Sequence, residues 1–283
     1  MNGLGYSKNS VYQQNVGFLK QYTPTAYRLI HLRCVRSAGF EERGNPTKGK
    51  KGSAGNSSKM AQSLSRSKSR IHELALCNPW EYFITLTISP EKFDRNNLPA
   101  YQKQLSKWLN NYNTRKGYQV RYLLIPEPHK NGAWHMHGLL MGLPLQALTL
   151  FTMADNIPSN IKRMLSQKRM IYNWGAYAST FGWVTVEQII AHDRCASYMT
   201  KYITKQLQDS SVALNHHVYY ASKGLARATL IHRGDMKENF EPDFENDYVR
   251  IKHFTNAEDA LPYFCDKEDM TYGTSTIDGE GNR

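Results

Sequence analysis

The sequence predicts an α+β fold in which a central, mostly antiparallel β-sheet is flanked by helices. Segments with strand-like alternation and β-branched residues are interspersed with segments whose apolar residues recur at helical spacing. Two of the expected strands are joined through an Asn-Gly turn, which is typical of an antiparallel hairpin. Hydrophobic residues make up 40% of the 283 positions and aromatic residues 12%, enough for a packed core.

The expected elements follow one another as helix, strand, helix, β-hairpin, helix, strand and helix. Pro79 ends the first helix, and Gly117 is the expected C-cap of the second. The expected bounds are 60–76 for the first helix, 81–88 for the strand EYFITLTI, 99–116 for the second helix, 121–125 and 134–141 for the hairpin, a helical stretch after Leu145, 183–189 for the last strand, and a final helix from near Asp193.

Charge and composition divide the chain into three parts. Residues 1–75 carry a net charge of +10, residues 76–233 also +10, and residues 234–283 a net charge of −8. We therefore expect a basic N-terminal segment with a Gly/Ser/Lys-rich linker over 1–58, a main domain over 59–233, and an acidic tail over 234–283. The basic excess is typical of a protein that binds a polyanion, although a solvated basic surface would look the same.

Several classes of protein are excluded by what the sequence lacks. No apolar stretch approaches the roughly 18 residues of a membrane span, and the N-terminus has no apolar signal region. The four cysteines lie far apart, which suits a reducing cytoplasm. Residues 44–51 approach a phosphate-binding loop but lack its Ser or Thr, so an ATPase is not expected. We expect a cytoplasmic protein without a membrane partner.

The segment WHMHGLL contains the first candidate site. On a strand, His135 and His137 point to the same face, and two imidazoles form half of a metal site. Glu127 on the preceding strand is the expected third ligand, with His129 as a competing candidate. A carboxylate with two imidazoles suits Mg²⁺ or Mn²⁺ acting on a phosphodiester. The plainer alternatives are a pair of surface histidines and a solvated carboxylate.

This metal site places a demand on the hairpin register. A strict two-residue turn at Asn131-Gly132 would set Glu127 across from Met136, on the wrong face of the sheet. We therefore predict an odd-numbered loop, or a bulge beside Pro126 or Pro128, which sets Glu127 across from one of the histidines.

The second candidate site is YMTKYITK, at residues 198–205. Tyr198 and Tyr202 are four residues apart, and each is followed three residues later by a lysine, Lys201 or Lys205. On a helix, residues at these spacings are neighbours, so phenols and ammonium groups share a face. Aromatic pairs at helical spacing also occur in ordinary cores, and spacing alone does not separate the two interpretations.

Taken together and in this order, the motifs resemble those of the HUH endonucleases, specifically the rolling-circle replication initiators (Rep) of small single-stranded DNA phages and plasmids. FITLT at 83–87 is similar to the first motif of that family, HMHGLL at 135–140 with the upstream Glu127 to the second, and YMTKYITK to the tyrosine motif. YYASKGL at 219–225 resembles a segment that follows the tyrosine motif in phage-type members.

The resemblance covers residues 60–231 and implies an HUH fold with an RRM-like (ferredoxin-like) sheet. It implies an enzyme that nicks and rejoins single-stranded DNA at a replication origin through a 5′-phosphotyrosine, with a metal on His135, His137 and Glu127. The tyrosines would be the nucleophiles, and Lys201 and Lys205 would position the phosphate. Host helicase and polymerase are further expected partners, in a bacterial host cell.

Two alternatives remain open at the level of sequence. One is a transposase or relaxase with the same chemistry, although relaxases usually place the tyrosine before the histidine strand. The other is an RRM-like protein that binds single-stranded nucleic acid without catalysis.

Overall fold

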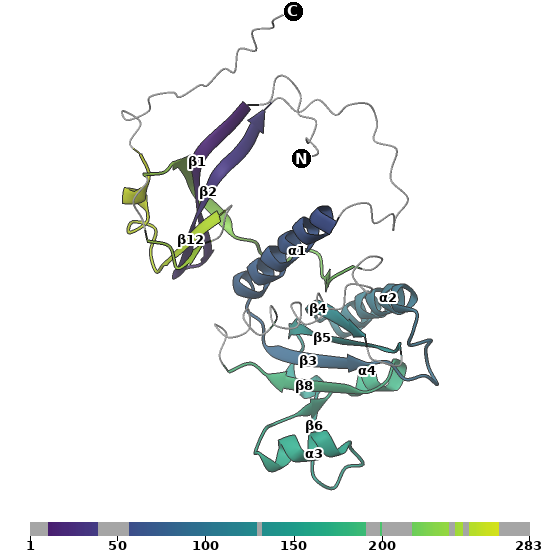
Figure 1. Ribbon diagram of the computed structural model, residues 1–283. Coiled ribbons are helices and arrows are strands. Elements are labelled where there is room, and N and C mark those ends of the chain that lie inside the picture. Colours follow the sequence, from purple (N-terminus) through teal and green to yellow (C-terminus); the bar gives the residue numbers. More distant parts are fainter. Residues whose placement is uncertain are drawn as a thin grey trace, which may run out of the picture. The chain divides into compact units, whose positions relative to one another are not determined.

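The fold of this chain comprises two antiparallel sheets, of five and seven strands, together with helices (Figure 1). In the computed structural model the described residues are 11–38, 57–128, 132–190, 199, 217–237, 241–245 and 249–265. Within them lie four α-helices, and the predicted α+β class is confirmed. No helix in these ranges is long and apolar enough to cross a membrane.

The chain divides into two compact units, Thr47–Arg227 and Met1–Pro46 together with Ala228–Arg283. The larger unit contains the seven-stranded sheet, in the order β6-β7-β8-β3-β5-β4-β9. Its strands are β3 (Tyr82–Thr87), β4 (Arg121–Pro128), β5 (Trp134–Met141), β6 (Thr149–Leu150), β7 (Tyr172–Asn173), β8 (Val184–Gln188) and β9 (Tyr220–Ala221). Its helices are α1 (Ser57–Cys77), α2 (Leu98–Lys116), α3 (Ser159–Ser166), α4 (Gly175–Thr180) and the 3₁₀ turn η1 (Leu145–Ala147).

These bounds confirm most of the elements expected for this unit. The predicted first helix, first strand, second helix and last strand correspond to α1, β3, α2 and β8, and the predicted second hairpin strand coincides with β5. The first hairpin strand, β4, continues three residues past the expected end, to Pro128. The helical stretch expected after Leu145 consists of separate short elements, η1, α3 and α4, with strand pairs between them.

Helix α2 shows why these residues form these elements. The Asn97 side chain caps its start by accepting a hydrogen bond from the Ala100 backbone N–H, and Gly117 ends it at φ +67°, as predicted. Its buried residues recur at helical spacing and are Leu98, Tyr101, Leu105, Leu109 and Tyr112. They pack on one face of the sheet against alternate residues of its strands, including Ile84, Leu86 and Met136.

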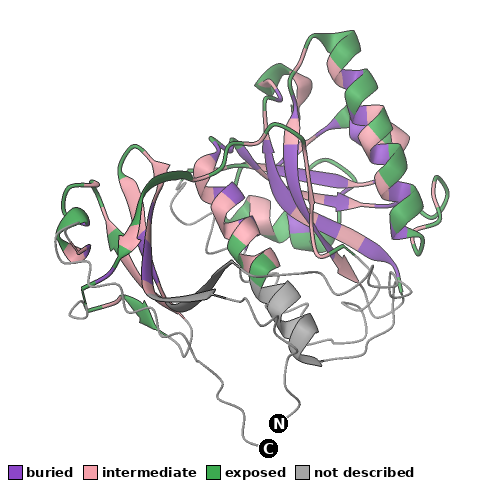
Figure 2. Ribbon diagram, turned by 90° about the horizontal axis from the view of Figure 1, so that it is seen from above, coloured by how far each residue is buried: buried purple, intermediate pink, exposed green. Residues whose placement is uncertain are grey.

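Helix α1 packs on the opposite face of the sheet. Its residues Ile71, Leu74 and Ala75 belong to a second buried cluster with Leu123, Ile125 and Leu139 of β4 and β5. Figure 2 shows most residues of the central strands as buried, in keeping with helices on both faces. The face under α1 also carries the candidate histidines, because it contains the alternate residues of β4 and β5.

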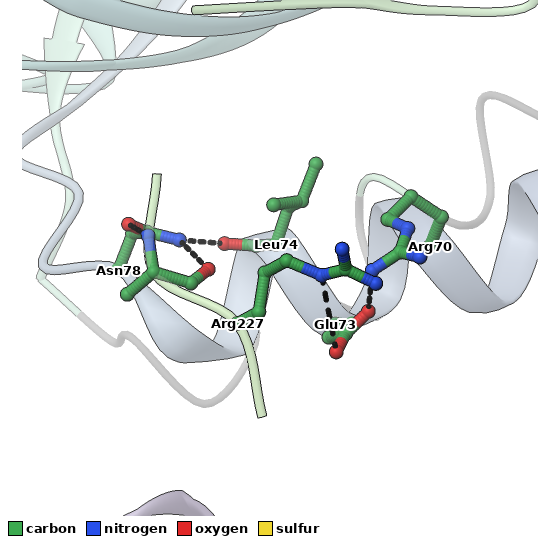
Figure 3. A network of polar contacts seen from close by, with 6 residues as sticks. Arg70, Glu73, Leu74, Asn78 and Arg227 are labelled. Carbon is green, nitrogen blue, oxygen red and sulfur yellow. Dashed lines mark hydrogen bonds and ion pairs between the residues drawn. The ribbon is translucent and has the colours of Figure 1, made fainter. Parts of the chain in front are cut away.

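A polar network holds the end of α1 to the segment that follows β9 (Figure 3). Buried Asn78 donates from Nδ2 to the carbonyl oxygens of Leu74, at 2.8 Å, and Ala226, at 3.0 Å, and its Oδ1 accepts from the Ala226 backbone N–H at 2.8 Å. Glu73 forms an ion pair with Arg70 and lies 4.0 Å from the Arg227 guanidinium. This network fixes the edge of the face on which α1 lies.

The smaller unit contains the five-stranded sheet, in the order β10-β1-β2-β12-β11. Its elements are β1 (Val11–Thr23), β2 (Ala26–Ala38), β10 (Thr229–Asp235), β11 (Phe244–Glu245), β12 (Val249–Phe254) and the 3₁₀ turn η2 (Leu261–Tyr263). The strand-like residues 27–35 therefore belong to β2 and pair with β1 and β12 in a sheet separate from that of the larger unit. Leu19, Leu29, Met236 and Phe264 form the centre of its core.

Candidate functional site

The hairpin β4–β5 sets Glu127 directly across from His135, and Ile125 across from His137. Opposed residues of an antiparallel pair share a face, so the carboxylate and both imidazoles lie on the same side of the sheet. The register prediction is confirmed. The two paired strands are separated by residues 129–133, an odd number, so the connection itself supplies the shift that the sequence demanded.

The expected alternative, a break in the ladder beside the prolines, is not what the structure shows. Pro126 pairs with Met136 and Pro128 with Trp134 without a register shift. Tyr122, which has the same phase along β4, exchanges its backbone groups with Ser222 beside β9. The missing N–H groups of both prolines therefore face away from β5, and the β4–β5 ladder loses no hydrogen bond.

Glu127 and His137 are in direct contact. The Glu127 Oε2 atom lies 2.7 Å from His137 Nε2, with side chains 20% and 16% exposed. The contact runs diagonally across the strand pair, which is within reach of these long side chains. The Phe83 ring of β3 lies parallel to the His137 ring, with centroids 6.5 Å apart, and this packs one side of the imidazole. The two groups are thus partly sheltered but still open to solvent.

Two threonines of β3 hold the other nitrogen of each imidazole. Thr85 pairs with His137 and Thr87 with His135, and each Oγ1 lies 3.1 Å from the facing Nδ1. The segment FITLT entered the sequence analysis only as a strand motif, so these contacts were missed. The equal spacing of Thr-Leu-Thr and His-Met-His was the available signal.

The donor types at this site fit a divalent cation. Two imidazole nitrogens and a carboxylate on one face suit Mg²⁺ or Mn²⁺, and imidazoles that bind a metal usually have their second nitrogen hydrogen-bonded, as here. Within the described ranges, however, no three His, Cys, Asp or Glu side chains are gathered closely enough to hold a metal ion. The direct contact of Glu127 with His137 must open to admit a cation, with His135 as the third donor by register.

The remaining predicted site residues lie outside the part of the chain that the structure describes. These are Tyr198, Lys201, Tyr202, Lys205 and the competing ligand His129. Within the same motif, helical Met199 is fully buried and belongs to the cluster of Ile71, Leu123 and Ile125. Met199 therefore packs on the face that carries the histidines.

The tyrosines of the opposite face have the wrong chemistry for a nucleophile. Tyr101 and Tyr177 share a buried hydrogen bond of 2.7 Å between their hydroxyls, and burial raises the pKa of each well above its usual value. Burial also raises the pKa of Tyr82 and Tyr220. A raised pKa makes a phenolate harder to form, so these four side chains suit the core.

A comparison with protein families assigns the segment that contains this site. Residues 81–207 match the family model described as Replication-associated protein ORF2. The match includes β3, β4 and β5, and therefore Glu127, His135 and His137, together with the motif YMTKYITK. No curated protein and no solved structure matches the chain. Through residues 81–207 the chain belongs to the replication-associated protein ORF2 family of phage rolling-circle replication proteins.

Proposed function

We propose that this chain is a replication initiator that nicks and rejoins single-stranded DNA at a replication origin, for rolling-circle replication of a phage or plasmid. The observation that carries the proposal is the contact between Glu127 and His137, with His135 in register beside them, inside the family-matched segment. Two imidazoles and a carboxylate on one sheet face are the donors that metal-assisted phosphodiester chemistry needs.

In this proposal, Tyr198 and Tyr202 are the nucleophiles. The phenol oxygen bonds to phosphorus, the bond from phosphorus to the 3′-oxygen breaks, and the proton passes in net from the phenol to the leaving 3′-oxygen. One phosphate ester replaces another, so rejoining needs no ATP. The burial of Met199 on the histidine face supports placing this motif beside the site.

A phenol with a pKa near 10 is a weak nucleophile at neutral pH, so the site must assist the reaction. A divalent cation on His135, His137 and Glu127 would supply charge neutralisation at the scissile phosphate. Lys201 and Lys205, each three residues after a tyrosine, would position the phosphate or stabilise the phenolate. With two tyrosines, one holds the first cut end while the other makes the second cut.

The test is covalent capture of DNA. The full chain is incubated with a randomised pool of single-stranded DNA and Mn²⁺, and adducts that survive denaturation are separated on a gel. We expect a metal-dependent adduct that His137→Ala abolishes, while DNA binding persists, because phosphate contacts supply most of the affinity. Tight binding of single strands without any adduct would contradict the proposal and favour the non-catalytic RRM-like alternative.

A further inference from the structure

Each imidazole of the site faces a threonine hydroxyl from the neighbouring strand. The pairs are Thr85 with His137 and Thr87 with His135, and both Oγ1–Nδ1 distances are 3.1 Å. Between them, Leu86 pairs with Met136, and both of these residues are buried in the core on the other face. The segments TLT and HMH thus form a two-rung ladder of hydroxyl on imidazole, with an apolar rung between them.

This ladder fixes which nitrogen of each imidazole faces the site. Because Nδ1 is held by a hydroxyl of β3, it is Nε2 that remains for the open side, and His137 Nε2 already contacts Glu127. A valine would satisfy the strand equally well in shape and β-propensity. The hydroxyl is therefore the feature of Thr85 and Thr87 that the sheet itself does not require.

A hydroxyl also suits both states of the imidazole. While His137 donates its Nε2 proton to the Glu127 carboxylate, a neutral ring accepts at Nδ1, and the Thr85 hydroxyl donates to it. When Nε2 gives up its proton to bind a cation, Nδ1 carries the proton and the same hydroxyl accepts. Rotation of one O–H bond serves both states without movement of the strand.

We propose that Thr85 and Thr87 are positioning residues, whose hydroxyls orient the His137 and His135 rings and thereby set the affinity of the site for a divalent cation. This inference rests on the proposed function, because it concerns the same metal site. Hydrogen bonds from outside the ligand shell typically change metal affinity by about ten- to a hundredfold, and we expect that range for each threonine.

The experiment measures Mn²⁺ binding to the full chain by calorimetry, without DNA. Thr85→Val and Thr87→Val remove the hydroxyl and keep the shape of the side chain, and each should weaken binding about ten- to a hundredfold. Thr85→Ser keeps a hydroxyl and should bind nearly as well as the wild type. Thr185→Val is the matched control, because Thr185 faces Thr85 from β8, one strand further from the histidines.

The outcomes separate this inference from the proposed function. If His137→Ala abolishes Mn²⁺ binding but Thr85→Val and Thr87→Val bind as the wild type does, the threonine role is overturned and the metal site stands. If the wild type binds no Mn²⁺, both are overturned. Should the valine variants fail to fold, the pair Thr85→Ala and Thr85→Ser decides instead, since these two side chains differ only in the hydroxyl. Equal Mn²⁺ affinity of that pair would overturn the role of Thr85.

Discussion

Gly138 follows the second histidine of the motif, in the middle of β5, and lies where two strands approach most closely. A Cβ atom placed there would lie 2.2 Å from the Leu123 carbonyl oxygen, 2.7 Å from Leu124 Cδ2 and 3.0 Å from Leu124 Cα. Two of these neighbours are backbone atoms of β4, so they cannot rotate away. Relief of the first contact requires β4 and β5 to separate by roughly 1 Å.

Gly138→Ala should therefore be strongly destabilising. Overpacking of a core typically costs about 1–3 kcal/mol, and a clash with backbone belongs at the upper end or beyond, so we expect a loss of about 3 kcal/mol or more. The same separation moves Glu127 of β4 away from His137 of β5, so Mn²⁺ binding should weaken as well. Both effects follow from one methyl group.

Urea unfolding followed by tryptophan fluorescence measures this loss. All five tryptophans lie within residues 47–227, so their emission reports on the larger unit. Gly175→Ala is the matched control, because a Cβ at the first residue of α4 would meet nothing within 4 Å. That control should be neutral or stabilising by up to about 1 kcal/mol. A Gly138→Ala unfolding free energy within about 1 kcal/mol of the wild type would refute the reasoning.

Two further predictions concern the histidine face and the helix on it. Asn78→Ala removes three hydrogen bonds that join the end of α1 to the segment after β9, and should lower the unfolding free energy by about 2–4 kcal/mol in the same urea assay; an unchanged midpoint would contradict this. Replacing Arg66 and Lys68 of α1 with Gln should weaken DNA binding and lower its salt dependence by about two phosphate contacts, measured by fluorescence anisotropy at several salt concentrations. The control, with Lys103 and Lys107 of α2 replaced by Gln, removes equal charge from the opposite face, and an equal loss of binding there would contradict a DNA path along α1.

The elements near the site could be predicted from sequence because their signals are local. Alternation placed β5 at its observed bounds, and the demand that Glu127 face a histidine gave the correct register. The mechanism of that register was only half predicted. The prolines lie inside the strand without breaking it, because their phase turns the missing N–H groups away from β5, and no local pattern encodes that phase.

The smaller sheet could not be predicted for a different reason. Strand β2 pairs with β12, and β1 with β10, so partners roughly two hundred residues apart in sequence must be matched. Segment composition describes 234–283 as acidic but does not say which strand it completes. The contacts of Thr85 and Thr87 depend likewise on the β3–β5 register, which joins residues about fifty positions apart.

The central claim is that tyrosine 198 or 202 becomes covalently attached to DNA at the site of Glu127, His135 and His137. The most direct test is peptide mapping by mass spectrometry of the adduct formed with single-stranded DNA and Mn²⁺. We predict a nucleotide on Tyr198 or Tyr202, retained in either single Phe variant and absent from the double Phe variant. An adduct that persists in the double variant, or that maps to another residue, would contradict the account.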